Sequence, residues 1–144
     1  MYKIALKWEG NMNLRGFDSK ERDVLMDASP EVGGLDKGMR PTELLLISLG
    51  GCAGLSLVNI LNKMRIEFEE FDVEIEAQRA GDPPKVFTSI SVKYIISSKV
   101  LTIEKLERAI RLGESNCSVA NMLVKACPIT YRYQLNGVNG GVII

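Results

Sequence analysis

The segment that begins at Pro41 is the feature that most constrains the fold of this chain. Proline fits the first turn of a helix because its missing N–H is no loss there, and the sequence predicts a helix from Pro41 to about Met64. At 1.5 Å per residue this helix is roughly 36 Å long. Its first half is apolar on all sides, which predicts a helix buried at the centre of the molecule. Glycine, serine and asparagine interrupt the apolar run, so it is interpreted as a core helix rather than a membrane span.

A glycine-rich stretch in the middle of this helix surrounds Cys52. Gly50, Gly51 and Gly54 each cost a helix about 1 kcal/mol relative to alanine, so their presence needs a compensating reason. Because glycine removes side-chain bulk, the stretch predicts that another element comes close to the helix beside the Cys52 sulfur. The alternative is that Cys52 is only a small buried hydrophobic residue, as cysteines in apolar surroundings usually are.

Composition predicts one soluble globular domain over residues 1–144. Hydrophobic residues make up 46% of the sequence and charged residues 25%, without a linker-like stretch or an internal repeat. Eighteen basic residues balance eighteen acidic residues and are dispersed, so no nucleic acid and no membrane is expected as a partner. The N-terminus alternates charged and apolar residues and does not look like a targeting segment, which predicts a cytoplasmic location.

Alternation of apolar and polar residues with a period of two predicts six strands. Three of them precede the long helix, two follow it as an antiparallel hairpin, and one lies near the end of the chain. Their ranges are Tyr2–Trp8, Met12–Phe17, Arg22–Ala28, Phe71–Gln78, Val86–Ile96 and Ile129–Leu135.

Two shorter helices are predicted between the fifth and sixth strands. Residues from Thr102 to Leu112 form an amphipathic pattern that ends near Gly113, and Ser115 is expected to cap a third helix that runs to about Ala126. The order is therefore three strands, a long helix, two strands, two helices and one strand. This order lacks βαβ alternation and predicts the α+β class.

Three cysteines and the absence of histidine restrict the chemistry that the chain supports. Without histidine there is no Cys-His or Ser-His catalysis and no His-ligated metal, and neither a metal nor a cofactor is expected. An activated thiol must depend on arginine, lysine, a helix dipole or the substrate. Cys117 is predicted to lie near the start of the third helix, where the dipole would lower the pKa of its thiol. Cys127 precedes Pro128 at a helix end and is interpreted as structural.

Cys52 and Cys117 are far apart in the sequence and form no Cys-x-x-Cys motif, so only the fold can bring them together. If the two sulfurs meet, their chemistry suits peroxide reduction. A thiolate attacks the O–O bond, becomes a sulfenic acid and condenses with the second thiol. A guanidinium can hold the thiolate ionised, which makes histidine dispensable.

Three segments give the chain a resemblance to the OsmC/Ohr superfamily of organic hydroperoxide resistance proteins. They are Pro41-Thr42-Glu43-Leu44-Leu45-Leu46, Leu49-Gly50-Gly51-Cys52 and Asn116-Cys117-Ser118-Val119. With the order of strands and helices, the resemblance covers nearly the whole chain. It implies an OsmC-like α+β fold with antiparallel sheets around a long buried central helix. It also implies an intertwined homodimer with active sites at the subunit interface.

The resemblance further implies a thiol peroxidase that reduces organic hydroperoxides in oxidative stress defence. Cys52 would be the peroxidatic thiol and Cys117 the resolving thiol, with a dithiol reductant such as a lipoylated protein. An arginine from the N-terminal strands would hold the Cys52 thiolate, and Arg15 is the best placed candidate. Arg22 and Arg40 are alternatives, and Arg15 could instead be a solvated strand residue.

A glutamate that fixes this arginine is also implied, and Glu43 is the candidate. Members of the hydroperoxide-resistance type carry it directly after the proline, where this chain has Thr42. On a helix Glu43 lies about 180° of rotation and roughly 13 Å from Cys52, so it is expected to act through an arginine or across the dimer. It could instead be a helix-start carboxylate that the dipole favours. The departure indicates a less characterised OsmC-like branch.

Two other functions remain open at this point. The same pocket could bind a hydrophobic small molecule without catalysis, with the cysteines as sensors or as packing. Alternatively, Cys52 could act on an electrophile that lacks an O–O bond. The peroxidase is favoured, with an organic substrate, because the apolar surroundings of Cys52 accept an alkyl chain better than they stabilise a small polar oxidant.

Overall fold

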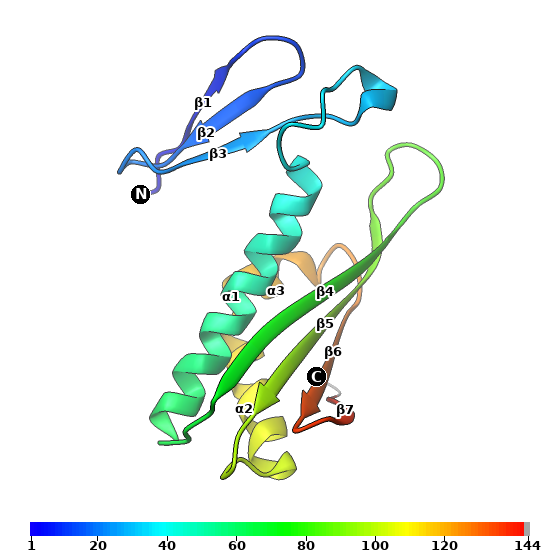
Figure 1. Cartoon of the computed structure of the whole chain (residues 1–144). Helices are drawn as coiled ribbons and strands as arrows, with labels where there is room; N and C mark the ends of the chain where they lie inside the picture. The colour runs from blue at the N-terminus through cyan, green and yellow to red at the C-terminus, as the bar shows by residue number, and fades with distance from the viewer. Residues whose placement is uncertain (143–144) are drawn as a thin grey trace. The chain divides into compact units, whose positions relative to one another are not determined.

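The structure is a computed structural model that describes residues 1–142 (Figure 1). Contacts within the chain form two compact units, one from Met1 to Leu46 and the other from Ile47 onward. The long helix α1 (Pro41–Lys63) belongs to both units. The single domain predicted over residues 1–144 stays a prediction.

The first unit contains a three-stranded antiparallel sheet in the order β1-β2-β3. All three predicted N-terminal strands are present, each shorter than its alternating pattern indicated. The elements are β1 (Ala5–Trp8), β2 (Leu14–Phe17), β3 (Asp23–Met26) and the short 3-10 helix η1 (Pro30–Val32).

Asp27 orders the loop that follows β3. Its side chain is buried, and its carboxylate accepts hydrogen bonds from the backbone N–H groups of Ala28 at 2.8 Å and of Leu35 and Lys37 at 3.0 Å. Close packing of the loop requires glycine at position 34, because a Cβ there would lie 1.8 Å from the Ala28 carbonyl oxygen. The loop leads directly into α1.

The second unit has two layers, with the helices on one face of a four-stranded sheet. The strand order is β4-β5-β6-β7, in which β5 and β6 are parallel and the other neighbours are antiparallel. Besides most of α1, its elements are β4 (Glu70–Arg79), β5 (Phe87–Ser97), α2 (Ile103–Asn116), α3 (Ser118–Leu123), β6 (Ile129–Leu135) and β7 (Val138–Val142).

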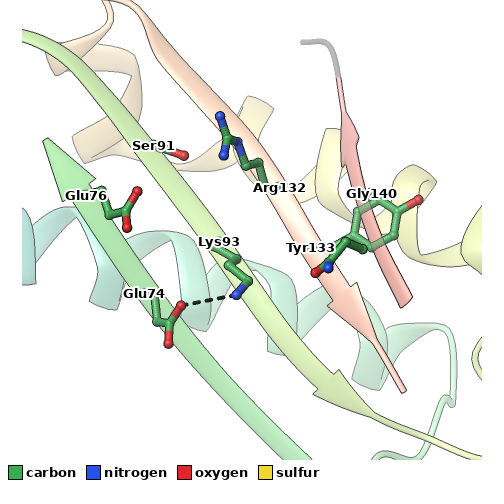
Figure 2. A pocket seen from close by; sticks show the side chains of 8 residues that line it. Glu74, Glu76, Ser91, Lys93, Arg132, Tyr133 and Gly140 are labelled. Carbon is green, nitrogen blue, oxygen red and sulfur yellow. Dashed lines mark hydrogen bonds and ion pairs between the residues drawn. The ribbon is translucent and has the colours of Figure 1, made fainter. Parts of the chain in front are cut away.

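The two faces of this sheet differ as the alternating patterns predicted. On β5, Ile90, Val92, Tyr94 and Ile96 are at most 2% exposed and face the helices. The opposite face carries a shallow polar depression, shown in Figure 2, where Glu74 and Lys93 form an ion pair at 3.4 Å. No cysteine lines that depression.

Two of the three glycines near Cys52 make the close approach that the sequence predicted. A Cβ on Gly50 would lie 3.0 Å from the side chain of Ile75, and a Cβ on Gly54 would lie 3.1 Å from that of Val73. Both contacts are with β4. Gly51 faces open space, so packing within the described residues does not explain it.

The second helix does not end where the sequence indicated. It continues past Gly113 to Asn116, and Cys117 rather than Ser115 caps α3. Gly113 instead faces α1, where a Cβ would make an ordinary contact 3.4 Å from the backbone nitrogen of Leu57. Both predicted boundaries are therefore wrong, because Gly113 lies inside α2, against α1, rather than at the helix end.

The α+β class is confirmed, with two additions. The crossover through α2 and α3 makes β5 and β6 parallel neighbours. The strand β7 was not predicted, although Asn136-Gly137 is the strongest short hairpin signal and both residues have positive φ, at 49° and 85°. Residues 136 and 137 turn the chain so that β7 pairs with β6.

One face of α1 remains uncovered in this structure. Among residues 1–142, α1 is long and apolar enough to cross a membrane by length and composition alone. The mean hydropathy of its apolar window is 2.1, and 28% of that window is buried. Its close contacts with β4 and α2 instead make it a core helix of the fold. On the uncovered face, Ile47 is 53% exposed and Leu55 is 74% exposed.

A matched pair of leucines on α2 tests this packing. Leu106 is fully buried whereas Leu112 is 42% exposed. We expect Leu106→Ala to lower the free energy of unfolding by about 2 to 5 kcal/mol through the cavity that it leaves, and Leu112→Ala to lower it by at most about 1 kcal/mol. Urea unfolding followed by circular dichroism measures both. Equal losses would contradict the orientation of α2.

Candidate active site

Cys52 and Cys117 lie next to each other at the start of α3. Cys52 is in the middle of α1, and Cys117 ends α2 and caps α3, where its Sγ accepts a hydrogen bond from the Ala120 N–H at 3.4 Å. The Cys52 Sγ lies 3.8 Å from the Ser118 Oγ, and the Cys117 thiol is close enough to influence the pKa of Cys52. Both cysteines are free thiols. The fold thus brings together two sulfurs whose proximity the sequence left open.

The surroundings of Cys52 favour its thiolate. Burial by itself would raise the pKa of this half-buried thiol. Hydrogen bonds from the backbone N–H groups of Val119 and Ser118, from the Ser118 hydroxyl and from the Cys117 thiol outweigh burial, and the pKa falls below its usual value of 9.0. The donors come from the first turn of α3, where N–H groups lack partners within the helix.

The surroundings of Cys117 have the opposite effect. Complete burial raises the pKa of this thiol to about 12, and the negative charges of Cys52 and Glu114 add to the effect of burial, against the Ala120 N–H. The prediction that the helix start lowers the pKa of Cys117 is therefore wrong. Desolvation dominates because the side chain is 0% exposed. The pair consists of one thiol with a lowered pKa and one with a raised pKa.

A buried carboxyl group next to this pair was missed by the sequence analysis. Glu114 is 4% exposed, and its Oε1 accepts a hydrogen bond from the Tyr94 hydroxyl. Burial raises the pKa of Glu114 against the lowering effect of the Tyr94 and Tyr131 hydroxyls. A signal was present in the sequence, because Glu114 follows Ile110 by four residues and so lies on the buried stripe of α2.

The predicted arginines all have carboxylate partners in the first unit. Arg15 on β2 forms ion pairs with Glu9 at 2.8 Å and with Asp23. Arg22 pairs with Asp18, and Arg40 pairs with Asp36. These contacts do not select one of the three, so Arg15 stays a prediction.

Glu43 lies in the first turn of α1. Its carboxylate accepts a hydrogen bond from the backbone N–H of Arg40 at 2.8 Å, which satisfies one donor at the start of the helix. This contact matches the helix-start alternative. Its role toward an arginine stays a prediction.

Cys127 is separate from the pair in the chain and lies after α3. It is 7% exposed, and its backbone N–H donates to the Leu123 carbonyl at 3.1 Å. Burial of this kind accords with the structural role expected for it.

Comparison with known proteins identifies the family. A family model described as OsmC-like protein matches residues 34–132, more than half of the chain. Protein YhfA from Escherichia coli strain K12 is 32% identical over 134 residues, which cover 92% of this chain and 97% of YhfA. The chain belongs to the OsmC-like family. Cys52, Cys117 and Glu43 lie within the matched segment, whereas Arg15 and Arg22 precede it.

Solved structures show the same fold. A hypothetical protein from Aquifex aeolicus VF5 is 25% identical with a TM-score of 0.81, covering 94% of this chain and 96% of that chain. An organic hydroperoxide resistance protein OsmC from Legionella pneumophila has a TM-score of 0.73, covering 92% of this chain and 96% of that chain. At 14% identity the Legionella protein shows likeness of fold alone.

The two pKa shifts predict different reactivities for the two thiols. We expect alkylation of Cys52 by iodoacetamide to have a midpoint below pH 9.0, whereas Cys117 stays unmodified until close to pH 12. Ser118→Ala should raise the Cys52 midpoint by about 0.5 to 1 pH unit because it removes one hydrogen bond to the thiolate. Rates measured by peptide mass spectrometry over a pH series give both midpoints.

Ser115→Ala is the matched control, because the Ser115 hydroxyl donates to the Leu112 carbonyl and not to a thiol. It should leave both midpoints unchanged. A Cys52 midpoint at or above 9.0 in the unsubstituted protein would contradict the assignment of the thiolate.

Proposed function

We propose that this OsmC-like protein is a thiol-dependent peroxidase that reduces organic hydroperoxides through a Cys52 sulfenic acid and a Cys52–Cys117 disulfide. The observation that carries the proposal is the difference in acidity between two adjacent thiols, because the pKa of Cys52 is lowered and that of Cys117 is raised. A peroxidatic thiol must be ionised to attack, and a resolving thiol must remain available until the sulfenic acid has formed. The lowered pKa of Cys52 and the raised pKa of Cys117 support these two roles.

The reaction balances with one peroxide and two thiols. The Cys52 thiolate attacks an oxygen of ROOH, the O–O bond breaks, and the alcohol ROH leaves after taking up a proton. The sulfur of Cys117 then attacks the sulfur of Cys52 sulfenic acid, its proton is lost, and water leaves as the disulfide forms. A dithiol reductant, such as a lipoylated protein, returns the disulfide to two thiols.

An organic substrate and a role in oxidative stress defence are supported by two lines of evidence. Cys52 lies on an apolar helix, where an alkyl chain is accepted better than a small polar oxidant. A protein of the same fold, from Legionella pneumophila, is named for organic hydroperoxide resistance. A reducing cytoplasm keeps such thiols free, and we propose that location for this protein.

An arginine completes the site in this proposal. A guanidinium next to the Cys52 thiolate would keep it ionised and polarise the departing oxygen without losing its own proton. We propose Arg15 for this role, with Glu43 fixing the guanidinium. No ligand other than substrate and reductant enters the cycle.

We also propose that the protein works as a homodimer. The uncovered face of α1 carries exposed Ile47 and Leu55, and β1 carries Leu6 and Trp8, which are 57% and 67% exposed. Exposed apolar side chains on each unit mark surfaces that another protein covers. We propose that a second copy of this chain covers the apolar face of α1 with its own apolar helix. The open space at Gly51 leaves room for the second helix to come close.

Charge on the uncovered face should dissociate this dimer. We expect Leu55→Lys to convert the protein to a monomer in sedimentation velocity, because burying the ammonium group in an apolar interface is costly. Val100→Lys is the matched control, since Val100 is 58% exposed and lies in the loop between β5 and α2. A monomeric unsubstituted protein at micromolar concentration would exclude the homodimer.

Cysteine substitutions test the peroxidase directly. We expect Cys52→Ser to abolish consumption of cumene hydroperoxide in the presence of dihydrolipoamide, because serine is not ionised at neutral pH. Cys117→Ser should react once and accumulate a sulfenic acid that dimedone traps. Cys127→Ala should retain activity and serves as the control.

Mass spectrometry of the reduced protein after one equivalent of peroxide identifies the Cys52–Cys117 disulfide. Full peroxidase activity in Cys52→Ser would contradict the proposal. Unreacted thiols in the unsubstituted protein, together with binding of an acyl ligand, would favour the noncatalytic binder instead.

A further inference from the structure

A polar groove lies between α1 and α2 in the second unit. It has a volume of about 220 Å³. Its lining consists of Ser56, Asn59, Ile60 and Lys63 from α1 and of Gly113 and Asn116 from α2. The groove is open to solvent, because Asn59, Lys63 and Asn116 are exposed.

The α1 wall of this groove continues the stripe of the helix that carries Cys52. With 3.6 residues per turn, Ser56, Asn59 and Lys63 all lie within about 40° of Cys52 around the helix axis. With a rise of 1.5 Å per residue, Lys63 is about 16.5 Å from Cys52 along that axis. The groove therefore starts about one helical turn from the Cys52 position and ends at a lysine.

The stripe that lines the groove is separate from the uncovered apolar face of α1. Leu55 and Gly51 lie about 60° and 100° from Cys52 around the helix axis, on one side of the stripe. The other side faces α2, where Asn116 directly precedes Cys117 in the chain. The groove thus lies between the proposed dimer face and α2.

The polar groups of the groove have unused hydrogen-bonding capacity. Among the hydrogen bonds and ion pairs of residues 1–142, none uses the side chain of Ser56, Asn59 or Lys63. The Asn116 side-chain nitrogen donates to the Leu112 carbonyl at 2.7 Å, and its side-chain oxygen accepts no bond within the described residues. The groove thus offers hydroxyl and amide groups along its length and one ammonium group at its far end.

These groups define the ligand by its chemistry. Hydroxyl and amide side chains pair with the N–H and C=O groups of an amide-containing chain, and an ammonium group pairs with a carboxylate or a phosphate. An alkyl chain would displace water from these groups without replacing its hydrogen bonds. A volume of about 220 Å³ is below the range of pockets for drug-sized ligands and suits one extended chain.

We propose that the groove binds a small thiol whose chain carries amide groups and ends in a carboxylate or phosphate, and that it places the sulfur of this thiol at Cys52. The inference rests on the proposed function, in which Cys52 is the reacting thiol. A thiol is the expected ligand because a Cys52 disulfide is reduced by thiol–disulfide exchange. The acidic end of the chain pairs with Lys63, and Asn59 pairs with its amide groups.

In the peroxide cycle this thiol acts as a second reductant beside the dithiol. Its thiolate attacks the Cys52 sulfur of the Cys52–Cys117 disulfide, the S–S bond breaks, and the Cys117 sulfur leaves with the electron pair and takes up a proton. A second molecule of the thiol loses its proton and attacks the mixed disulfide. Cys52 then leaves as a thiolate, and the two small thiols leave as one symmetrical disulfide.

Disulfide exchange tests the groove without peroxide. In a Cys117→Ser, Cys127→Ala protein, Cys52 is the one remaining thiol of the chain. Its thiolate attacks a symmetrical disulfide, the S–S bond of that disulfide breaks, and one small thiolate leaves and takes up a proton. Mass spectrometry of the mixed disulfide over time at pH 7 gives the rate.

Two matched pairs of probes and one baseline probe are compared. Phosphopantetheine disulfide is paired with pantethine, which lacks the phosphate. Glutathione disulfide is paired with its ethyl ester, in which the glycine carboxylate is blocked. Hydroxyethyl disulfide has neither amide nor acid and gives the baseline reactivity of Cys52.

We expect the acidic member of at least one pair to react about fivefold faster than its neutral match, because it pairs with Lys63. Lys63→Met should remove this difference and leave the neutral probes unchanged. Asn59→Leu should slow the amide-containing probes about fivefold without changing the baseline probe. Lys93→Met is the matched control, because Lys93 pairs with Glu74 on the opposite face of the sheet. It should leave all rates unchanged.

Each outcome decides the inference or the source of the ligand. Equal rates within both pairs overturn it, and so does a preference that survives Lys63→Met or is lost equally in Lys93→Met. Failure of Cys52 to react with any probe also overturns it. A preference for the phosphate alone identifies a pantetheine-type thiol, and a preference for the carboxylate alone identifies a peptide thiol. A protein that shows the preference but consumes no hydroperoxide would keep the groove as a thiol site and lose the proposed peroxidase function.

Discussion

The close contact of α1 with its neighbours is the constraint on which the candidate site depends. Gly50 and Gly54 let the helix lie against the side chains of β4, and Gly113 lets α2 lie against its backbone. These approaches bring the middle of α1 to the junction of α2 and α3. A larger side chain at Gly50 or Gly54 would crowd the Ile75 and Val73 side chains of β4.

Within that contact, two sulfurs a short distance apart have opposite acid–base properties. Cys52 is half-buried and receives several hydrogen bonds, which stabilise its negative charge. Cys117 has no exposure to water and faces negative groups, which penalise its charge. In the same low-polarity region the pKa of Cys117 is therefore raised and the pKa of Cys52 is lowered. The difference arises because more hydrogen-bond donors are directed at the Cys52 sulfur. A two-thiol redox cycle needs this asymmetry.

The sequence predicted the elements better than their ends. The six strands and the long helix follow from periodicity, and β6 has the bounds that the pattern indicated. The predicted end of α2 was wrong because Gly113 lies inside the helix and faces α1. Local helix propensity gives no information about such a tertiary contact. The strand β7 was missed even though Asn136-Gly137 signalled a hairpin, because its residues are short on apolar alternation.

The sequence by itself determined the family, the α+β class and the two cysteines that merit attention, because these are carried by local motifs and by the spacing of apolar residues. Only the tertiary structure decided that Cys52 and Cys117 lie together, which of them has the lower pKa, and that Glu114 belongs to their surroundings. Proximity between distant segments and the burial of a charged group arise from packing, and pKa values depend on both. A sequence pattern does not predict how many backbone N–H groups will point at a given sulfur in the folded chain.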